Sequence, residues 1–247
     1  MPRLVLLIRT RKLMWPAAAL MVLLITVILI RVGLTSPIPD GAPGNLAGRR
    51  IAIDPGHGGI DGGTNRPDFL EKEVNLAVAL RLRDDLIARG AEVVLTREED
   101  IDLGMMSPED GDGRYLRGLK TRVSIIEQNQ SDLFLSIHVN ANHRLPSTSG
   151  PMVFYSRKTP ASRALAETLQ ARLNALAEEK GLKRHSAGPA RFFLLENCRT
   201  TGVIVELGFM TNRTERALLE NGDYQQELVQ AVIEGLKDFF AQEGSVD

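Results

Sequence analysis

Residues 132–139 read DLFLSIHV, a strongly apolar segment that predicts a strand. A strand that is apolar on both sides is typical of a parallel sheet covered by helices on both faces, because neither face then meets water. One polar ring, His138, stands near the end of this segment, and Asn140 and Asn142 follow it. The segment therefore predicts the centre of a helix-covered sheet, with polar side chains at the carboxyl end of the strand.

Strands and helices alternate on both sides of this segment. Residues 71–89 carry apolar side chains at four-residue spacing, which predicts a helix that Gly90 ends. Asn212, with Glu215 three residues later, resembles a capping box at a further helix start. The remaining predicted strands are 50–54, 92–96, 151–155, 191–195 and 203–207, and the remaining helices are 115–128, 159–180 and 224–240. We predict one α/β domain over residues 49–243, with a mostly parallel twisted sheet, helices on both faces and ligands beyond the carboxyl strand ends.

The composition excludes some classes of function. Lys and Arg number 30 against 31 Asp and Glu, and aromatic residues make up 5% of the 247 residues. Nucleic-acid binding would favour a basic excess or a base-stacking surface, so we expect no nucleic-acid partner. Cys198 is the single cysteine, so the chain has no internal disulfide. We interpret it as a small buried hydrophobe rather than a nucleophile.

The N-terminal region predicts a membrane anchor. Residues 13–30 contain no charged side chain and would make a helix of roughly 27 Å, about the thickness of the hydrocarbon layer. A basic tail, residues 1–12, precedes the predicted transmembrane segment 13–32, so the tail should be cytoplasmic and the rest exported. Residues 33–48 are rich in Pro and Gly and predict a linker. A cleaved signal peptide and a buried core helix are the alternatives.

Two histidines fall where predicted strands end. His57 lies in the loop DPGHGGIDGG, six of whose residues are Gly or Pro, and such a loop lets backbone approach a metal or a substrate. His138 lies in the apolar strand. Taken alone, His57 could be a surface residue and His138 a hydrogen-bonded core histidine.

Carboxylates complete the candidate set. Glu206 interrupts the apolar run VIVELGF, and a buried carboxylate is costly unless it is paired, protonated or bound to metal. An ion pair with an arginine such as Arg122 is the alternative. Glu71 and Glu73 open a helix, where acidic residues are common because they favour the helix dipole. Two imidazoles and one carboxylate suit a catalytic zinc, and a second carboxylate can move the proton. Spacing alone does not choose between Glu71 and Glu73.

Four segments together resemble a known family, in the family's order and over nearly all of residues 50–241. They are IAIDPGHGGIDGGT, LEKEVNLAVALRLRDDLIARGAEVVLTRE, DLFLSIHVNAN and VIVELGFMTNRTERALL. They resemble the zinc-dependent N-acetylmuramoyl-L-alanine amidases, which cleave the amide between N-acetylmuramic acid and the first L-alanine of the peptidoglycan stem peptide. The resemblance implies Zn²⁺ ligands at His57, Glu71 and His138, and a catalytic carboxylate at Glu206.

A finer likeness points to the germination-specific, membrane-anchored (CwlD-type) branch, whose members act on spore cortex on the way to muramic-δ-lactam. It rests on one catalytic domain behind one anchor, and on the stretches FFLLENC and VELGFMTN. The loop DGGTNRPDFLEKE differs in detail from common versions in the family. This likeness implies an exported domain at the cell membrane, in the forespore or spore envelope.

Several possibilities stay open at this point. Asn140 or Arg122 could orient substrate or support the zinc ligands. The same zinc site could serve a peptidase or a deacetylase acting on peptidoglycan, or the chain could be a non-catalytic wall-binding module. An activating partner protein is a further possibility.

Overall fold

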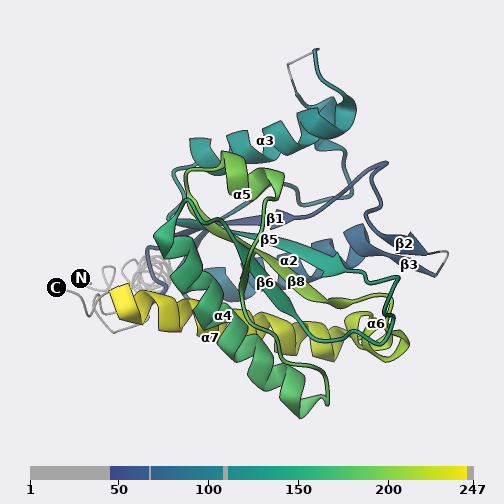
Figure 1. Ribbon diagram of the computed structural model, residues 1–247. Helices are drawn as coiled ribbons and strands as arrows, with labels where there is room; N and C mark the ends of the chain where they lie inside the picture. The colour runs from purple at the N-terminus through teal and green to yellow at the C-terminus, as the bar shows by residue number, and fades with distance from the viewer. Residues whose placement is uncertain (1–44, 67, 108–110, 244–247) are drawn as a thin grey trace, which may run out of the picture. The chain divides into compact units, whose positions relative to one another are not determined.

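The computed structural model describes residues 45–66, 68–107 and 111–243 (Figure 1). The strands are β1 (Arg50–Pro55), β2 (Asn65–Arg66), β3 (Phe69–Leu70), β4 (Glu92–Leu95), β5 (Leu133–Asn140), β6 (Met152–Tyr155), β7 (Gly188–Pro189) and β8 (Thr201–Phe209). The helices are α2 (Glu71–Ile87), the short 3-10 helix η1 (Leu103–Met105), α3 (Arg114–Gln128), α4 (Pro160–Glu179), α5 (Phe193–Asn197), α6 (Arg213–Leu219) and α7 (Gly222–Glu243).

One sheet organises these elements, in the order β4-β1-β5-β8-β6-β7. The strands β4, β1, β5 and β8 run parallel, whereas β6 is antiparallel to β8 and carries β7 parallel to itself at the edge. The sheet is therefore mixed. Its parallel part contains β5, and β6 and β7 form an edge of opposite direction that the sequence did not predict.

Helices cover both faces, as expected from the apolar central strand. In β1, Ile51 and Ile53 point into the larger core with α2, α4 and α7, while Ala52 points into a smaller core with α3 and α5. Figure 1 shows α3 and α5 on one side of the sheet and α4 and α7 on the other. Alternate residues of a strand point to opposite faces, so a fully apolar strand is explained by the two cores.

One predicted strand, 191–195, is wrong, because the helix α5 occupies residues 193–197. Leu194 and Leu195 are both buried in the smaller core, together with Cys198. Consecutive residues of a strand would point to opposite faces, but one helical turn lets all three side chains face the same core. The burial of Cys198 agrees with its interpretation as a small hydrophobe.

The capping box at α6 is confirmed only in its first half. The Asn212 side chain accepts hydrogen bonds from the backbone N–H groups of Thr214 and Glu215. The Glu215 carboxylate does not reach back to Asn212; it accepts from the N–H groups of Phe209 and Gly150. Glu215 thus joins the end of β8 to the start of the β6 segment.

The predicted basic tail and the transmembrane segment, residues 1–32, lie outside the described residues, as does most of the predicted linker. Within the described ranges, no helix combines the length and apolar character that crossing a membrane requires. At the start of the described chain, Leu46 is buried in the larger core and Gly48 N–H donates to Gly90 O over 2.9 Å.

Candidate metal centre

The loop after β1 brings His57 to the carboxyl end of the sheet. The N–H of Gly56 donates to Ile137 O over 2.9 Å, which ties the loop to β5. His57 has a φ of 62°, a left-handed conformation that is uncommon for residues other than Gly. A Cβ on Gly56 would lie 2.2 Å from His138 Cε1, so only Gly lets the loop pass this close to the second histidine.

Glu71, the first residue of α2, lies between the two imidazoles. Its Oε1 is 3.1 Å from His57 Nε2 and 3.1 Å from His138 Nδ1. The two rings meet edge to face, with centroids 5.0 Å apart. One nitrogen or oxygen atom from each of the three residues lies within 4.8 Å of the others. The loop, the helix start and the central strand therefore converge on one point.

Glu73, the rival of Glu71, lies elsewhere. Its side chain is exposed and lines a shallow hollow with Asp68, Phe69 and Glu220. Glu71 is 2% exposed, and its carboxylate also accepts from Thr64 N–H and Val139 N–H. Of the two glutamates, the geometry brings only Glu71 to the histidines.

Charge interactions within the cluster are strong. Burial alone would raise the pKa of Glu71, but hydrogen bonds and charge interactions with His138 and His57 hold that pKa well below its usual range. Burial alone would lower the pKa of His57, but the carboxylates of Asp61 and Glu71 raise it to about 9. The cluster thus concentrates negative charge between two nitrogen donors, which is the environment that a divalent cation prefers.

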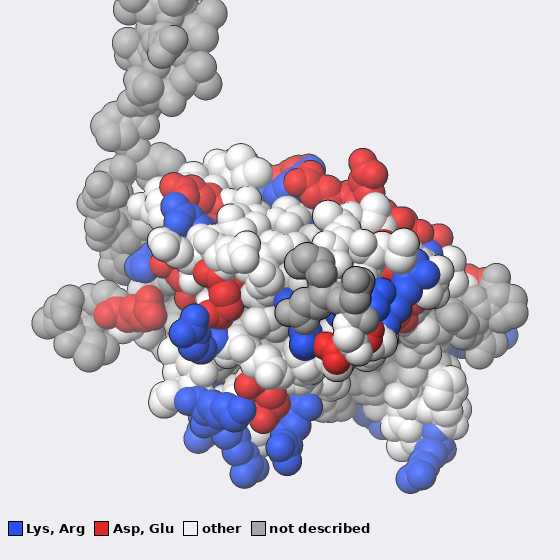
Figure 2. All heavy atoms as spheres, turned by 90° about the horizontal axis from the view of Figure 1, so that it is seen from above, with Lys and Arg blue, Asp and Glu red and all other residues white. Residues whose placement is uncertain are grey.

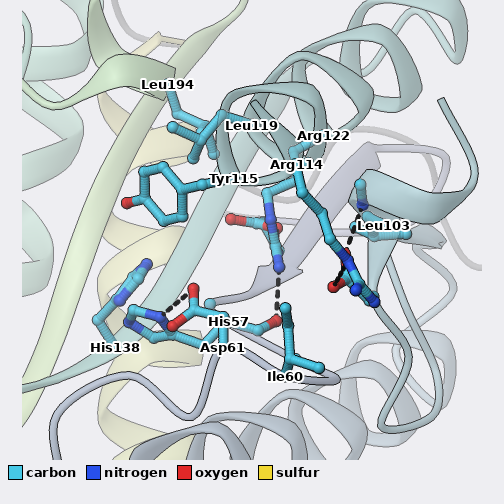
Figure 3. A pocket seen from close by; sticks show the side chains of 16 residues that line it. His57, Ile60, Asp61, Leu103, Arg114, Tyr115, Leu119, Arg122, His138 and Leu194 are labelled. Carbon is cyan, nitrogen blue, oxygen red and sulfur yellow. Dashed lines mark hydrogen bonds and ion pairs between the residues drawn. The ribbon is translucent and has the colours of Figure 1, made fainter. Parts of the chain in front are cut away.

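Asp61 is a site residue that the sequence analysis missed. Its Oδ2 lies 2.8 Å from His57 Nδ1, so a proton on Nδ1 leaves Nε2 free to face Glu71 (Figure 3). A carboxylate behind an imidazole in this way fixes the tautomer and the ring orientation of a metal-binding histidine. Its position four residues after His57, in the same glycine-rich loop, is a sequence signal that would have found it.

Glu206 lies in β8 directly opposite His138 of β5, so the two side chains share one face of the sheet. It is 9% exposed, and its Oε2 has no hydrogen-bond partner among the described residues. Burial, aided by the charge of Glu71 and opposed by His138 and His57, raises the pKa of Glu206 to about 7. A buried carboxyl group with a near-neutral pKa is suited to accept and return a proton.

Arg122 and Asn140, the two further candidates, are engaged with the protein itself. Arg122 forms an ion pair with Asp54 rather than with Glu206, and it donates to the carbonyls of Pro55 and His57. The Asn140 side chain accepts from the next backbone N–H, that of Ala141. The alternative of an Arg122–Glu206 ion pair is therefore wrong.

A cleft of about 240 Å³ lies beside the histidines. Its lining combines apolar side chains with charged ones: Ile60, Leu103, Tyr115, Leu119 and Leu194, and Asp61, Asp102, Arg114 and Arg122. Figure 3 shows the Tyr115 ring between Leu119 and the two histidines. The cleft gives a substrate access to the cluster along a lining that is partly apolar and partly charged.

The donor set fits zinc. Two imidazole nitrogens and one carboxylate oxygen, with room for a further ligand, are the pattern of catalytic zinc sites. The buried Glu71 carboxylate faces two histidines and pairs with both of their rings. Such a carboxylate is stabilised most simply by a cation held between the three residues.

The outer surface on the side of α3 and α5 carries both signs of charge. Figure 2 shows acidic and basic side chains interspersed among uncharged ones, with basic side chains gathered along one edge. This distribution matches the near-zero net charge of −1.

Comparison with known proteins gives a consistent result. A family model described as N-acetylmuramoyl-L-alanine amidase matches residues 51–238. The germination-specific N-acetylmuramoyl-L-alanine amidase of Bacillus subtilis is 35% identical over 204 residues, which cover 81% of this chain and 83% of that protein. The amidase LytC of the same organism is 34% identical over 197 residues, covering 79% of this chain but 36% of LytC.

Solved structures of amidases also resemble this chain. The CwlD amidase from Clostridioides difficile, solved in complex with the GerS lipoprotein, is 30% identical, with a TM-score of 0.69 over 77% of this chain and 98% of that one. The catalytic domain of CwlV from Bacillus (Paenibacillus) polymyxa is 29% identical, with a TM-score of 0.65 over 77% of this chain and 97% of that one.

Proposed function

The chain belongs to the N-acetylmuramoyl-L-alanine amidase family, and from this premise we propose that one zinc ion, held by His57, Glu71 and His138, serves its amidase activity. The observation that carries the proposal is the convergence of three donor atoms within 4.8 Å from three separate segments. Zinc in such a site supplies Lewis acidity for an amide carbonyl and lowers the pKa of water towards neutrality.

Glu206 is the group that we propose moves the proton. Burial raises the pKa of Glu206 above the usual range of a carboxyl, which favours a group that takes a proton from water and returns it to the leaving amine of L-alanine. Its Oε2 has no hydrogen-bond partner in the part of the chain that the structure describes, which supports this role, because a carboxylate held in an ion pair would be a weaker base. Asp61 holds the His57 ring, and the cleft walls restrict the approach of water and substrate.

The substrate that we propose is peptidoglycan, specifically the amide between N-acetylmuramic acid and L-alanine in spore cortex. The support is the likeness to the germination-specific amidase of Bacillus subtilis over 83% of that protein's length. For location, we propose that residues 13–32 anchor the chain in the membrane with the catalytic domain outside the cytoplasm. The support is the length and apolar character of residues 13–30 together with the basic tail before them.

A partner protein is also proposed. The CwlD structure was solved with the GerS lipoprotein, and this chain covers 98% of that CwlD chain. We propose that a lipoprotein of this kind binds the exported domain and controls its activity.

The test is to incubate the full chain and zinc with purified cortex and vegetative peptidoglycan, and to identify the products by mass spectrometry. We expect free stem peptides that begin with L-alanine, intact N-acetylmuramic acid, and faster release from cortex. Release of acetate would indicate a deacetylase, and cleavage within the stem peptide would indicate a peptidase. Equal rates on both substrates would refute the cortex preference while leaving the amidase reaction in place.

A further inference from the structure

The backbone carbonyls around His57 are held by two buried arginines. Arg97 donates from Nε to Pro55 O over 3.0 Å and from Nη2 to Gly56 O over 2.9 Å. Arg122 donates from Nη1 to Pro55 O over 2.8 Å and from Nη2 to His57 O over 2.5 Å. The two side chains, here called the guanidinium pair, therefore bind all three successive carbonyls of the segment 55–57.

The same pair reaches the helix that carries Glu71. Arg97 Nη2 also donates to Lys72 O over 3.0 Å, and Arg97 Nη1 donates to Glu99 O over 3.1 Å. One guanidinium thus joins the residue before His57 to the residue after Glu71. The planar, forked donor set of arginine makes such a multiple contact possible, whereas an ammonium group offers a single point of charge.

Burying two cations side by side is costly. Arg97 is 2% exposed and Arg122 is 7% exposed. Burial, followed by the charge of Arg122, lowers the pKa of Arg97 to about 10. Asp54 offsets part of the cost as an ion-pair partner of Arg122, and its carboxylate is itself held by the hydroxyls of Thr96 and Ser136. Apolar side chains would avoid the cost of two buried charges but would leave the carbonyls of residues 55–57 without these donors, so the pair is explained by what it does to this main chain.

Backbone conformation supplies that explanation. Beyond Pro55 the loop leaves the sheet ladder, and His57 takes a left-handed φ of 62°, which is unfavourable for a residue with a Cβ unless other contacts support it. Hydrogen bonds to the carbonyls on both sides of the Gly56–His57 peptide bond resist relaxation of that conformation. The His57 ring keeps its place only if this main chain does.

We propose that Arg97 and Arg122 are positioning residues, which act through the backbone of residues 55–57 to hold His57 Nε2 beside Glu71 and so set the affinity of the site for zinc. This inference rests on the proposed function, because it takes His57 and Glu71 as zinc ligands. The hydrogen bonds of the pair go to main-chain carbonyls and to Asp54 rather than to side-chain atoms of the three proposed ligands, although Arg122 also lines the cleft. The pair therefore acts on the place of one ligand through the main chain.

The test measures zinc affinity of the full chain by competition with a chromophoric chelator, and thermal stability of the metal-free form by circular dichroism. Arg97→Lys and Arg122→Lys keep the charge but lose the forked donors, and each should weaken zinc binding by about tenfold or more. Arg117→Lys is the matched control: Arg117 also donates to two carbonyls, those of Gly104 and Asp112, but not to the His57 loop. Its zinc affinity should equal that of the wild type.

A double-mutant cycle separates positioning from a general loss of structure. In a His57→Ala background, Arg97→Lys should lower thermal stability by the same amount as it does when His57 is present. It should leave the residual zinc affinity unchanged, because His57, the ligand that Arg97 positions, is absent. An equal loss of zinc affinity in both backgrounds would overturn the inference. Wild-type zinc affinity in both Arg97→Lys and Arg122→Lys would also overturn the inference, provided that His57→Ala loses zinc. Wild-type affinity in His57→Ala itself would instead reject the proposed ligand set, and the inference with it. If Arg97→Lys does not fold, Arg122→Lys takes its place in the cycle.

Discussion

His138 stands within a strand and His57 within a loop, and their ring centroids are 5.0 Å apart. The strand that carries His138 lies between two parallel neighbours, with Ile137 opposite Pro55 and His138 opposite Glu206. Its main chain is fixed by ladder hydrogen bonds up to His138, where the register with β8 shifts before Asn140, and by apolar side chains buried on both faces. The loop that carries His57 leaves the sheet after Pro55. It is held by the guanidinium pair, by Gly56 N–H, by the bridge between Gly58 and Asp61, by the Asp61 side chain, and by Asp100 and Lys72 at Gly59.

The difference indicates which half of the site is more sensitive to the loss of a single contact. The position of a strand is set by many small contacts, so removing one of them shifts a neighbouring side chain little. The position of the loop depends on a few polar contacts, each with a specific donor geometry. We therefore expect substitutions on the strand side to affect chemistry or stability, and substitutions on the loop side to affect zinc affinity.

The largest effect is expected on the strand side, from Glu206→Gln. Glutamine keeps the shape of the side chain but cannot accept a proton, so turnover should fall by about 10²–10⁴-fold. The zinc content should stay at the wild-type level, because the proposed ligands are untouched. The measurements are kcat on peptidoglycan fragments and metal content after dialysis.

Glu73→Gln is the control for this substitution, since Glu73 is an exposed glutamate at the start of α2. It should keep wild-type turnover and zinc content. A Glu206→Gln enzyme with undiminished kcat would remove Glu206 from the proposed mechanism, and one that loses zinc would make it part of the metal-binding set.

On the loop side, Asp61→Asn is expected to weaken zinc binding by about 10–100-fold. An amide can face His57 Nδ1 with either its oxygen or its nitrogen, so it no longer fixes the tautomer that presents Nε2 to Glu71. The affinity would be measured by chelator competition. Asp100→Asn is the matched control, because Asp100 also holds this loop, through Gly59 N–H and Lys72, but does not contact the ring. Equal losses in the two variants would mean that the loop needs tethering in general rather than orientation of the ring.

Much of the fold and of the site follows from the sequence, and the exceptions have physical reasons. The apolar strand DLFLSIHV placed His138 correctly at the sheet centre, because burial on both faces leaves a clear pattern. The sequence analysis left Glu71 and Glu73 open on spacing, but the structure shows a signal that would separate them: Val74 and Val78 form the buried line of α2, and Glu71 lies on that line at three- and seven-residue spacing. Glu73 is two residues away and lies off it.

Hydrogen bonds from side chains to distant main-chain atoms leave no periodic pattern in the sequence. Arg97 and Arg122 act on the carbonyls of residues 55–57, and a hydrogen bond to a distant main-chain atom does not depend on which side chain that residue has. The same holds for Glu215, whose expected partner was Asn212 and whose observed partners are the N–H groups of Gly150 and Phe209. Sequence patterns report burial better than they report polar contacts between distant segments.

Gly56→Ala would test the contact between the loop that carries His57 and the strand that carries His138. A Cβ at Gly56 would lie 2.2 Å from His138 Cε1, so the ring or the loop must move, at a cost of about 1–3 kcal/mol in the free energy of unfolding. Because the displaced group is a proposed ligand, zinc affinity should fall as well. Gly48→Ala is the control: Gly48 has a φ of +74°, but a Cβ there meets nothing within 4 Å. It should lose stability through backbone strain and keep its zinc affinity. A Gly56→Ala variant with unchanged zinc affinity would show that the two halves of the site adjust independently.

The smallest effect on zinc binding is expected from Glu215→Gln, which tests a buried carboxylate on the strand side. Glu215 is fully buried, and burial raises its pKa from 4.5 to about 7, although two backbone N–H groups oppose the rise. A raised pKa means that the folded state binds the proton more tightly than the unfolded state. The stability from this group is therefore fully present below pH 4.5 and is lost as the pH rises through about 7. Glutamine does not titrate. Between pH 4.5 and about 7, the free energy of unfolding of the variant should therefore rise relative to that of the wild type by at most about 1.4 kcal/mol per pH unit.

Urea unfolding of the metal-free proteins across this pH range measures the difference, and Glu220→Gln, a substitution of an exposed glutamate, is the control. Since Glu215 holds Phe209 and Gly150 rather than a proposed ligand, zinc affinity should not change. Parallel stability curves for Glu215→Gln and the wild type would mean that the carboxylate is ionised at no net cost, and a loss of zinc affinity would mean that the strand side is as fragile as the loop.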